Sequence, residues 1–286
     1  MRNPREDLAS GEESPEPTEV ETPPETPSVG GASLKGYEIL NQYPVRDGRE
    51  ASEIVLSSID HNEAPRVGVL GDTGCGKTEA MRRLVEGWLA KVPRGLVVIV
   101  DDKGLTSPFS GQERKDVQDL KANPVDKRGP RVVILRGDRF DRARGQVDPE
   151  TAAEVQWALA QQGRPTLGVY DELPKGAVYG QWRKTPSTIS WGFSQGRDVQ
   201  AGMLWGGQET QQIPAEAFNQ SGYIFQFRSM GNPIRLLRER NYVDPEVAKV
   251  IAALPGHELP RPQRGYFVLL QRGRAWNRVI YRYRQK

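Results

Sequence analysis

Short runs of apolar residues recur along the chain and predict buried β-strands. The clearest lie at residues 66–70, 96–100, 131–135, 166–170 and 223–228. A further run at 202–207 contains three glycines but has the same apolar character. Apolar runs that are continuous rather than alternating are typical of parallel strands covered on both faces. We therefore expect a mainly parallel sheet.

Segments with helical spacing separate these runs. Residues 79–90 place apolar side chains along one side of a helix. Residues 148–162 have Asp148 at a capping position and Pro149 at the first helical position, and Gly163 follows them. Shorter helices are predicted at 50–59, 117–121, 194–201, 214–219 and 244–254, and a strand at 37–40.

Strands that alternate with helices predict an α/β fold, a doubly wound, mainly parallel sheet with helices on both faces. Residues 265–284 predict a C-terminal β-hairpin that turns at Arg272 and Gly273. In sheets of this kind, ligands bind at the carboxyl ends of the strands. The residues that follow each strand are therefore the first candidates for a functional site.

The chain divides into four predicted parts. Residues 1–33 form an acidic, proline-rich tail that cannot bury enough apolar surface to become ordered. This tail is either a solvated leader or a docking segment. Residues 34–65 lead into a core at 66–260, and residues 261–286 form a basic hairpin packed on that core.

The distribution of charge suggests a polyanionic partner. The tail carries two arginines and eight acidic residues, so the rest of the chain has a net charge of +9, against +3 for the whole. Solubility alone would also explain this imbalance. The single cysteine excludes a disulfide framework, and no apolar run reaches the ~18 residues that span a bilayer. We expect a soluble or peripheral protein that is not secreted.

Residues 71–78 have the pattern G-x-x-x-x-G-K-[ST] of a phosphate-binding loop. A predicted strand precedes the loop and a predicted helix follows it, so unpaired backbone N–H groups at the helix start would attract an anion. The expected nucleotide-binding residues are Gly71, Asp72, Thr73, Gly74, Cys75, Gly76, Lys77 and Thr78. Lys77 is expected to reach the β- and γ-phosphates of ATP, and the Thr78 hydroxyl to bind Mg²⁺. Cys75 is either a small residue at a permissive position or a point of sensitivity to oxidation.

An acidic pair follows the predicted strand at 166–170. Asp171 is expected to hold Mg²⁺, and Glu172 to act as the general base that activates water. Without the phosphate-binding loop, the pair would merely cap the next turn. A glutamate beside the metal-binding aspartate indicates an extra strand between the loop strand and the acidic strand, and residues 132–135 are the candidate for it.

The order of these motifs resembles that of the FtsK/HerA superfamily of DNA-translocating ATPases. The resemblance rests on the segments 71–78, 98–104, 169–172, 194–198 and 207–210. It covers residues 64–272 and implies a RecA-like P-loop NTPase fold.

The same resemblance assigns roles to three further residues. Gln208 is implied to be the sensor of the γ-phosphate. Arg197, 25 residues after Glu172, is implied to be an arginine finger inserted into a neighbour's site, with Arg228 as the alternative. A finger supplied by a neighbour implies a homo-oligomeric ring, with six subunits as the expected size.

In size and layout the chain is similar to the genome-packaging ATPases of membrane-containing viruses with double-jelly-roll capsids, the tectivirus-like group. The membrane helices and winged-helix module of FtsK and the barrel domain of HerA are not visible here. The resemblance implies double-stranded DNA as a partner, with a capsid vertex or a viral membrane protein as docking partner. The implied location is the host cytoplasm or the packaging vertex of the virion.

Two basic segments are candidates for DNA contact. Residues 173–193 are predicted to form a long functional loop, in which Lys175, Arg183 and Lys184 would meet phosphates. Phosphate contacts carry no sequence information, which suits a motor that tracks any sequence. Residues 261–286 hold seven arginines and one lysine without an acid, which is either a second contact or a solvated edge.

Three functions remain open from the sequence. The first is a viral motor that packages double-stranded DNA, and the second is a cellular or plasmid translocase of the same superfamily. The third is an assembly, secretion or switch ATPase that moves no DNA. Stimulation of ATP turnover by DNA separates the third from the first two.

Overall fold

The computed structural model describes residues 38–59, 64–101, 109, 111–114, 131–136, 149–171, 173, 188–208, 213, 215–256, 259–260 and 264–283. The predictions for residues 1–33 and 117–121 lie outside these ranges. The strands are β1 (Val45–Asp47), β2 (Arg66–Leu70), β3 (Leu96–Asp101), β4 (Gln112–Arg114), β5 (Val132–Arg136), β6 (Thr166–Tyr170), β7 (Ala201–Gly207), β8 (Tyr223–Phe227), β9 (Tyr266–Gln271) and β10 (Ile280–Arg282). The helices are α2 (Gly48–Ser57), α3 (Lys77–Lys91), α5 (Pro149–Gln161), α7 (Thr188–Gln195), α8 (Ala215–Gln220), α9 (Asn232–Glu239) and α10 (Pro245–Ala253).

The strands form one ten-stranded sheet in the order β1-β10-β9-β8-β2-β7-β6-β3-β5-β4. From β8 to β4 all neighbours are parallel, whereas β9 pairs antiparallel with both β8 and β10. This confirms the predicted doubly wound, mainly parallel sheet with a C-terminal antiparallel pair. β10 is not the sheet edge, because β1 pairs with it in parallel.

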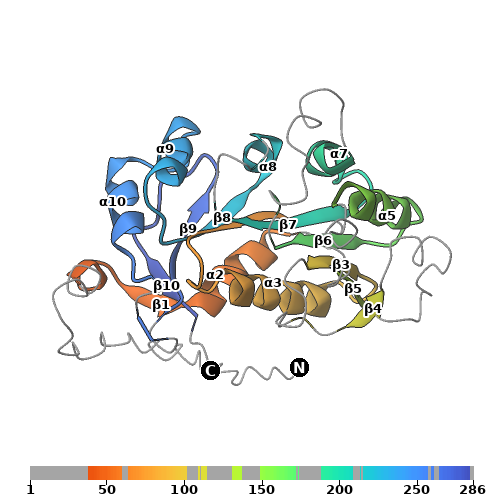
Figure 1. The fold of residues 1–286 in the computed structure, drawn as a ribbon, viewed down its shortest axis with the longest axis horizontal. Helices are drawn as coiled ribbons and strands as arrows, with labels where there is room; N and C mark the ends of the chain where they lie inside the picture. Colours follow the sequence, from red (N-terminus) through yellow and green to blue (C-terminus); the bar gives the residue numbers. More distant parts are fainter. Residues whose placement is uncertain are drawn as a thin grey trace, which may run out of the picture.

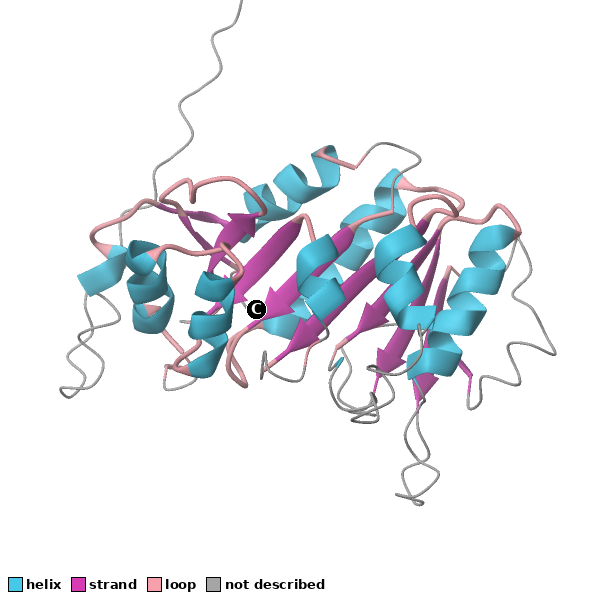
Figure 2. Ribbon diagram, turned by 90° about the horizontal axis from the view of Figure 1, so that it is seen from above, coloured by secondary structure: helices cyan, strands magenta, loops and turns pink. Residues whose placement is uncertain are grey.

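Helices cover both faces of the sheet (Figures 1 and 2). α2 and α3 lie on one face, where Val55, Met81 and Trp88 are buried in a single hydrophobic cluster. α5, α7, α8, α9 and α10 lie on the other face, above a second cluster that includes Phe193 and Phe218. Burying a large apolar side chain contributes about 1.5–3 kcal/mol, so these two layers hold the helices on the sheet.

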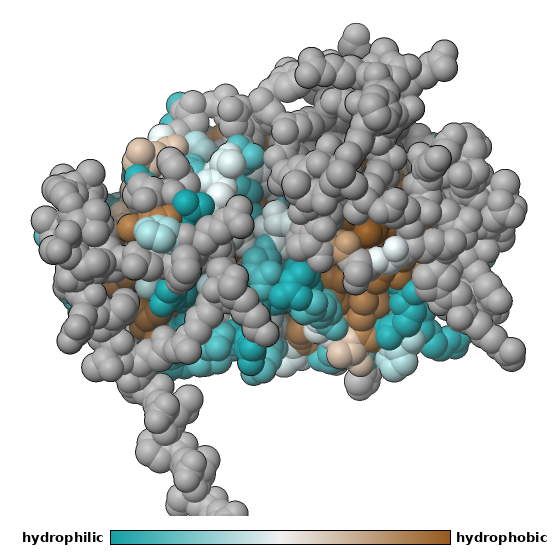
Figure 3. Space-filling model, turned by 60° about the horizontal axis from the view of Figure 1, so that its bottom comes forward, coloured by the Kyte–Doolittle hydropathy of each residue, from teal (hydrophilic) through white to brown (hydrophobic). Residues whose placement is uncertain are grey.

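The outer side of α3 is charged. Hydrophilic side chains gather across the middle of the molecular face on which Figure 1 places this helix (Figure 3). Glu79 pairs with Arg82 and Arg83, each at 2.8 Å, and Arg82 also pairs with Glu86. The helix is therefore amphipathic, as its spacing predicts.

The strand between β2 and β6 is β7, so the prediction that residues 132–135 take this place is wrong. Those residues belong to β5, which pairs with β3 and β4. Glycine allows β7 to lie close to the residue that follows β6. A Cβ at Gly206 would lie 2.7 Å from the Asp171 carbonyl oxygen and 2.6 Å from the end of the Met81 side chain, so a larger residue would force the backbone at Asp171 to shift.

Two further element predictions are wrong. Residues 38–40 are helical rather than extended, and Leu40 reaches the core from this turn with 2% of its surface exposed. The helix predicted at 194–201 begins earlier, as α7, because Ile189 and Phe193 lie one helical turn apart and are both buried. β1, β4 and α9 were not predicted at all.

No helix within the described ranges is long and apolar enough to cross a bilayer.

Candidate nucleotide-binding site

The predicted phosphate-binding loop connects the end of β2 to the start of α3. Three of its glycines have positive φ angles, 149° at Gly71, 74° at Gly74 and 112° at Gly76. At Gly71, a Cβ would lie 2.6 Å from the Cβ of Phe227. Glycine is therefore needed both for the backbone conformation and for the close approach of β8.

The ends of two neighbouring strands hold the loop. The Gly71 N–H donates to the Gly207 carbonyl at the end of β7, at 3.4 Å. The Asp72 N–H donates to the Arg228 carbonyl beyond β8, at 2.8 Å. The first N–H groups of a helix lack acceptors within that helix, and those of α3 begin directly at the loop, which favours an anion there.

Lys77 lies inside the loop. Its side chain is buried, with 6% of the residue exposed. The ammonium donates to the carbonyl oxygens of Gly71 and Asp72, at 2.7 Å each. This geometry puts the cation where the motif predicts contact with phosphate oxygens.

Thr78 and Asp171 meet at the carboxyl ends of β2 and β6. The Thr78 hydroxyl oxygen lies 3.4 and 3.5 Å from the two Asp171 carboxylate oxygens. Asp171 is buried, with 5% exposed. A hydroxyl and a carboxylate are the hard oxygen ligands that Mg²⁺ takes beside nucleotide phosphates. The pair thus has the donor set that the predicted magnesium site needs.

Gln208 lies directly after β7 and so between the loop and Asp171. The Thr73 hydroxyl of the loop donates to the Gln208 side-chain oxygen at 2.7 Å. The predicted sensor therefore contacts the loop itself. Glu172, the predicted base, lies outside the described residues.

The two candidate finger arginines lie at opposite ends of the parallel strands. Arg197 is exposed in the turn between α7 and β7, and nearby Gln200 accepts from the N–H of Thr166 at the start of β6. β7 has seven residues, which puts Arg197 roughly 20 Å from the loop of its own subunit. Arg228 instead lies at the loop edge, where its carbonyl binds Asp72.

Cys75 is buried in the loop, with 1% exposed, and its thiol donates to the Asp72 carbonyl at 2.9 Å. Burial raises the pKa of this thiol above its ordinary value. Because the thiolate is the reactive form, these properties favour a packing role over sensitivity to oxidation.

Of the two basic segments that are candidates for DNA contact, the structure describes part of the C-terminal one. Lys175, Arg183 and Lys184 lie outside the described residues. In the C-terminal segment, Tyr281 and Tyr283 are buried and stack on Phe267, with ring centroids 5.7 and 5.0 Å away. These rings belong to the core and are not available to nucleic acid.

One arginine of the same segment reaches the nucleotide loop. A terminal nitrogen of Arg264 donates to the Gly74 carbonyl at 3.4 Å. The two residues are 190 positions apart. No local pattern in the sequence signals this contact.

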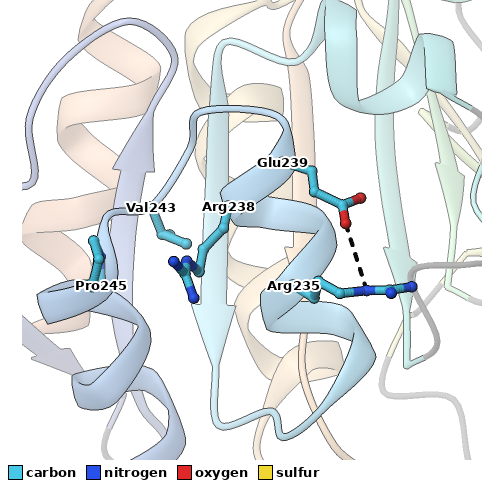
Figure 4. A pocket seen from close by; sticks show the side chains of 5 residues that line it. All are labelled: Arg235, Arg238, Glu239, Val243 and Pro245. Carbon is cyan, nitrogen blue, oxygen red and sulfur yellow. Dashed lines mark ion pairs between the residues drawn. The ribbon is translucent and has the colours of Figure 1, made fainter.

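A separate pocket of about 510 Å³ lies between α9 and the start of α10 (Figure 4). It is lined by Arg235, Arg238, Glu239, Val243 and Pro245. Arg235 and Glu239 form an exposed ion pair at 3.6 Å. None of the loop residues lines this pocket, so it is not part of the candidate site.

A glycine-rich loop between a parallel strand and a helix, with a buried lysine inside it and a threonine facing an aspartate, defines a P-loop NTPase fold. Within this class, the structure is similar to that of the genome packaging NTPase B204 from Sulfolobus turreted icosahedral virus 2. The TM-scores are 0.58 for its sulfate complex, at 16% sequence identity, and 0.57 for its ATP-gammaS complex, at 17%. Each comparison covers 80% of this chain and 100% of B204.

The B204 DNA-packaging ATPase from Sulfolobus turreted icosahedral virus gives a TM-score of 0.56 at 17% identity, over 79% of this chain and 99% of that one. No protein-family model and no curated protein matches the sequence. The similarity confirms the predicted resemblance in fold to viral packaging ATPases.

Proposed function

We propose that this protein is an ATP-hydrolysing translocase of double-stranded DNA, of the viral genome-packaging kind. The observation that carries the proposal is the meeting of Lys77, Thr78, Asp171 and Gln208 at one sheet edge. The fold shared with B204 over the whole length of that protein supports the same function.

Each residue of the site has a task in ATP hydrolysis. Lys77 neutralises charge on the β- and γ-phosphates, and Thr78 with Asp171 holds Mg²⁺. When bound there, Mg²⁺ would supply positive charge that offsets the charge developing on the phosphates. Glu172 accepts the proton of the attacking water, and Gln208 detects the γ-phosphate from its position beside Thr73.

The proposed assembly is a homo-oligomeric ring, with six subunits expected. The exposed position of Arg197, far from the loop of its own subunit, supports a role in a neighbour's site. DNA would pass the cations Lys175, Arg183 and Lys184. The ring would work in the host cytoplasm or at the packaging vertex of the virion, beside capsid or viral membrane proteins.

The test is ATP turnover at low salt, measured with and without long double-stranded DNA. Wild type should turn over ATP faster with DNA. Lys77→Ala and Glu172→Gln should lose about 10²-fold or more, the range for removal of a general base or a phosphate-binding cation. Glu216→Gln, at an exposed glutamate on α8, serves as a matched control that should keep wild-type turnover.

One outcome would contradict the translocase proposal without contradicting the nucleotide site. In that outcome DNA leaves turnover unchanged, whereas Lys77→Ala still abolishes it. The assembly, secretion or switch ATPase would then be the better description.

A further inference from the structure

We propose that Arg264 is a nucleotide-binding residue, which the C-terminal segment supplies to the phosphate-binding loop of its own subunit. The inference rests on the proposed nucleotide site and adds a residue to it. The ligand is the α/β-phosphate part of a nucleoside di- or triphosphate.

The first argument is the position of the guanidinium. A terminal nitrogen of Arg264 lies 3.4 Å from the carbonyl oxygen of Gly74, in the middle of the loop. The backbone N–H groups of such a loop wrap the α- and β-phosphates. Arg264 therefore lies beside the segment that would wrap these two phosphates, and the proposal is that its guanidinium reaches them when a nucleotide binds.

The second argument is that Arg264 is held in place. Its Nε donates to the carbonyl of Leu259, so the guanidinium is fixed at two points. The next residue, Gly265, has a φ of 95°, and a Cβ there would lie 2.5 Å from the Tyr283 carbonyl oxygen. The Tyr283 N–H donates to the Gly265 carbonyl at 3.1 Å. The backbone that carries Arg264 is thus tightly packed where it enters β9.

The third argument is charge. Arg82, Arg83 and Arg278 each pair with a glutamate. Arg264 donates to two carbonyl oxygens and, among the residues that the structure describes, forms no ion pair with a carboxylate. A half-buried guanidinium whose described partners are two neutral carbonyls favours an anion, and its planar fork matches phosphate oxygens.

Taken together, these contacts place the segment before β9 beside the nucleotide loop. β7 contributes Gln208 on one side of the loop, and the segment before β9 contributes Arg264 on the other. At least one basic residue of this segment, Arg264, would then take part in nucleotide binding.

The test is the dissociation constant for ATPγS and for ADP, measured by calorimetry with Mg²⁺ and without DNA. Arg264→Ala should weaken both ligands by about 10- to 100-fold, the range for loss of one charge-assisted hydrogen bond. Arg264→Lys should fall between wild type and Arg264→Ala. Arg274→Ala removes an exposed arginine from the same segment and should bind like wild type.

Arg264→Gln separates a contact to the nucleotide from a tether of the loop, because glutamine keeps an N–H donor for the Gly74 carbonyl but removes the charge. Binding as weak as that of Arg264→Ala supports the proposal. Binding like wild type in Arg264→Gln, or a change below twofold in Arg264→Ala, overturns it. If Arg264→Ala does not fold, the Lys and Gln variants decide: tighter binding by Lys supports the proposal, and equal binding overturns it.

Lys77→Ala in the same assay separates the two proposals. Loss of binding there, with Arg264→Ala unchanged, would leave the nucleotide site intact and refute only the role of Arg264. A wild-type protein that binds neither nucleotide would refute both.

Discussion

At the scale of single residues, the hydroxyl of Thr73 has a role beyond its place in the loop motif. It donates to Gln208, whose position after β7 sets it between the loop and Asp171. The motif tolerates any residue at position 73, whereas the structure gives this one a partner. We infer that Thr73 orients Gln208 and is a positioning residue.

Thr73→Val keeps the branched shape and removes the hydroxyl. A hydrogen bond of this kind contributes about 0.5–1.5 kcal/mol, so kcat for ATP should fall about 2- to 12-fold. KM should change little because the phosphate contacts of the loop remain. Thr73→Ser, which keeps the hydroxyl, should restore kcat. Steady-state kinetics check this, and equal losses in the Val and Ser variants would contradict it.

At the scale of elements, the strands and the loop follow from local sequence, but their order in the sheet does not. Continuous apolar runs predict β2, β3, β5 and β6, and the spacing of glycines predicts the loop. The place of β7 depends on pairing with strands more than 30 residues away, which no local pattern encodes. The contact of Arg264 with Gly74 is equally non-local.

The sequence of α9 contains a weak local signal for a helix. Pro233 occupies its first turn, and Ile234 and Leu237 are spaced for one face, with Leu237 fully buried. The helix has only eight residues, and arginines interrupt its apolar side, so the pattern is short. α9 is therefore hard to predict because its apolar pattern is short, not because its residues lack helical spacing.

The first turn of α3 supports a prediction about pH. Hydrogen bonds from Arg82, followed by those from Arg83, lower the pKa of Glu79 below its ordinary value. A carboxylate with a lowered pKa in the folded state stabilises the protein above its unfolded-state pKa, and this contribution disappears as pH falls through the folded-state pKa.

Glu79→Gln should therefore lower the free energy of unfolding by up to about 1 kcal/mol at pH 7, and by progressively less as the pH falls below about 4. Urea unfolding at several pH values measures the difference. Glu53→Gln, at an exposed glutamate on α2, should have no such pH-dependent effect. A Glu79→Gln difference that stays constant with pH would show that the ion pairs contribute nothing.

At the scale of the whole molecule, the two ends of the parallel strands differ in what they carry. The candidate nucleotide-binding residues lie at the carboxyl ends, and the exposed Arg197 lies at the amino ends. In the ring that we propose, the amino ends of the strands of one subunit would face the carboxyl ends of the next subunit's strands, so that a neighbour would complete each site.

Mixing variants tests this arrangement. Arg197→Ala and Glu172→Gln should each lack DNA-stimulated turnover, and mixed rings should recover roughly a quarter of it, because random assembly leaves that share of sites with both groups. Glu172→Gln mixed with Lys77→Ala should recover nothing, since both defects lie in the same subunit's site. If Arg228→Ala rather than Arg197→Ala abolishes turnover, the finger is Arg228.

The central claim is that ATP hydrolysis at this site moves double-stranded DNA. The most direct measurement is displacement of a third strand from a triplex on linear duplex DNA. We predict displacement by wild type with ATP and none with ATPγS or with Glu172→Gln. Hydrolysis of ATP that proceeds at the DNA-stimulated rate without displacing the third strand would contradict the claim.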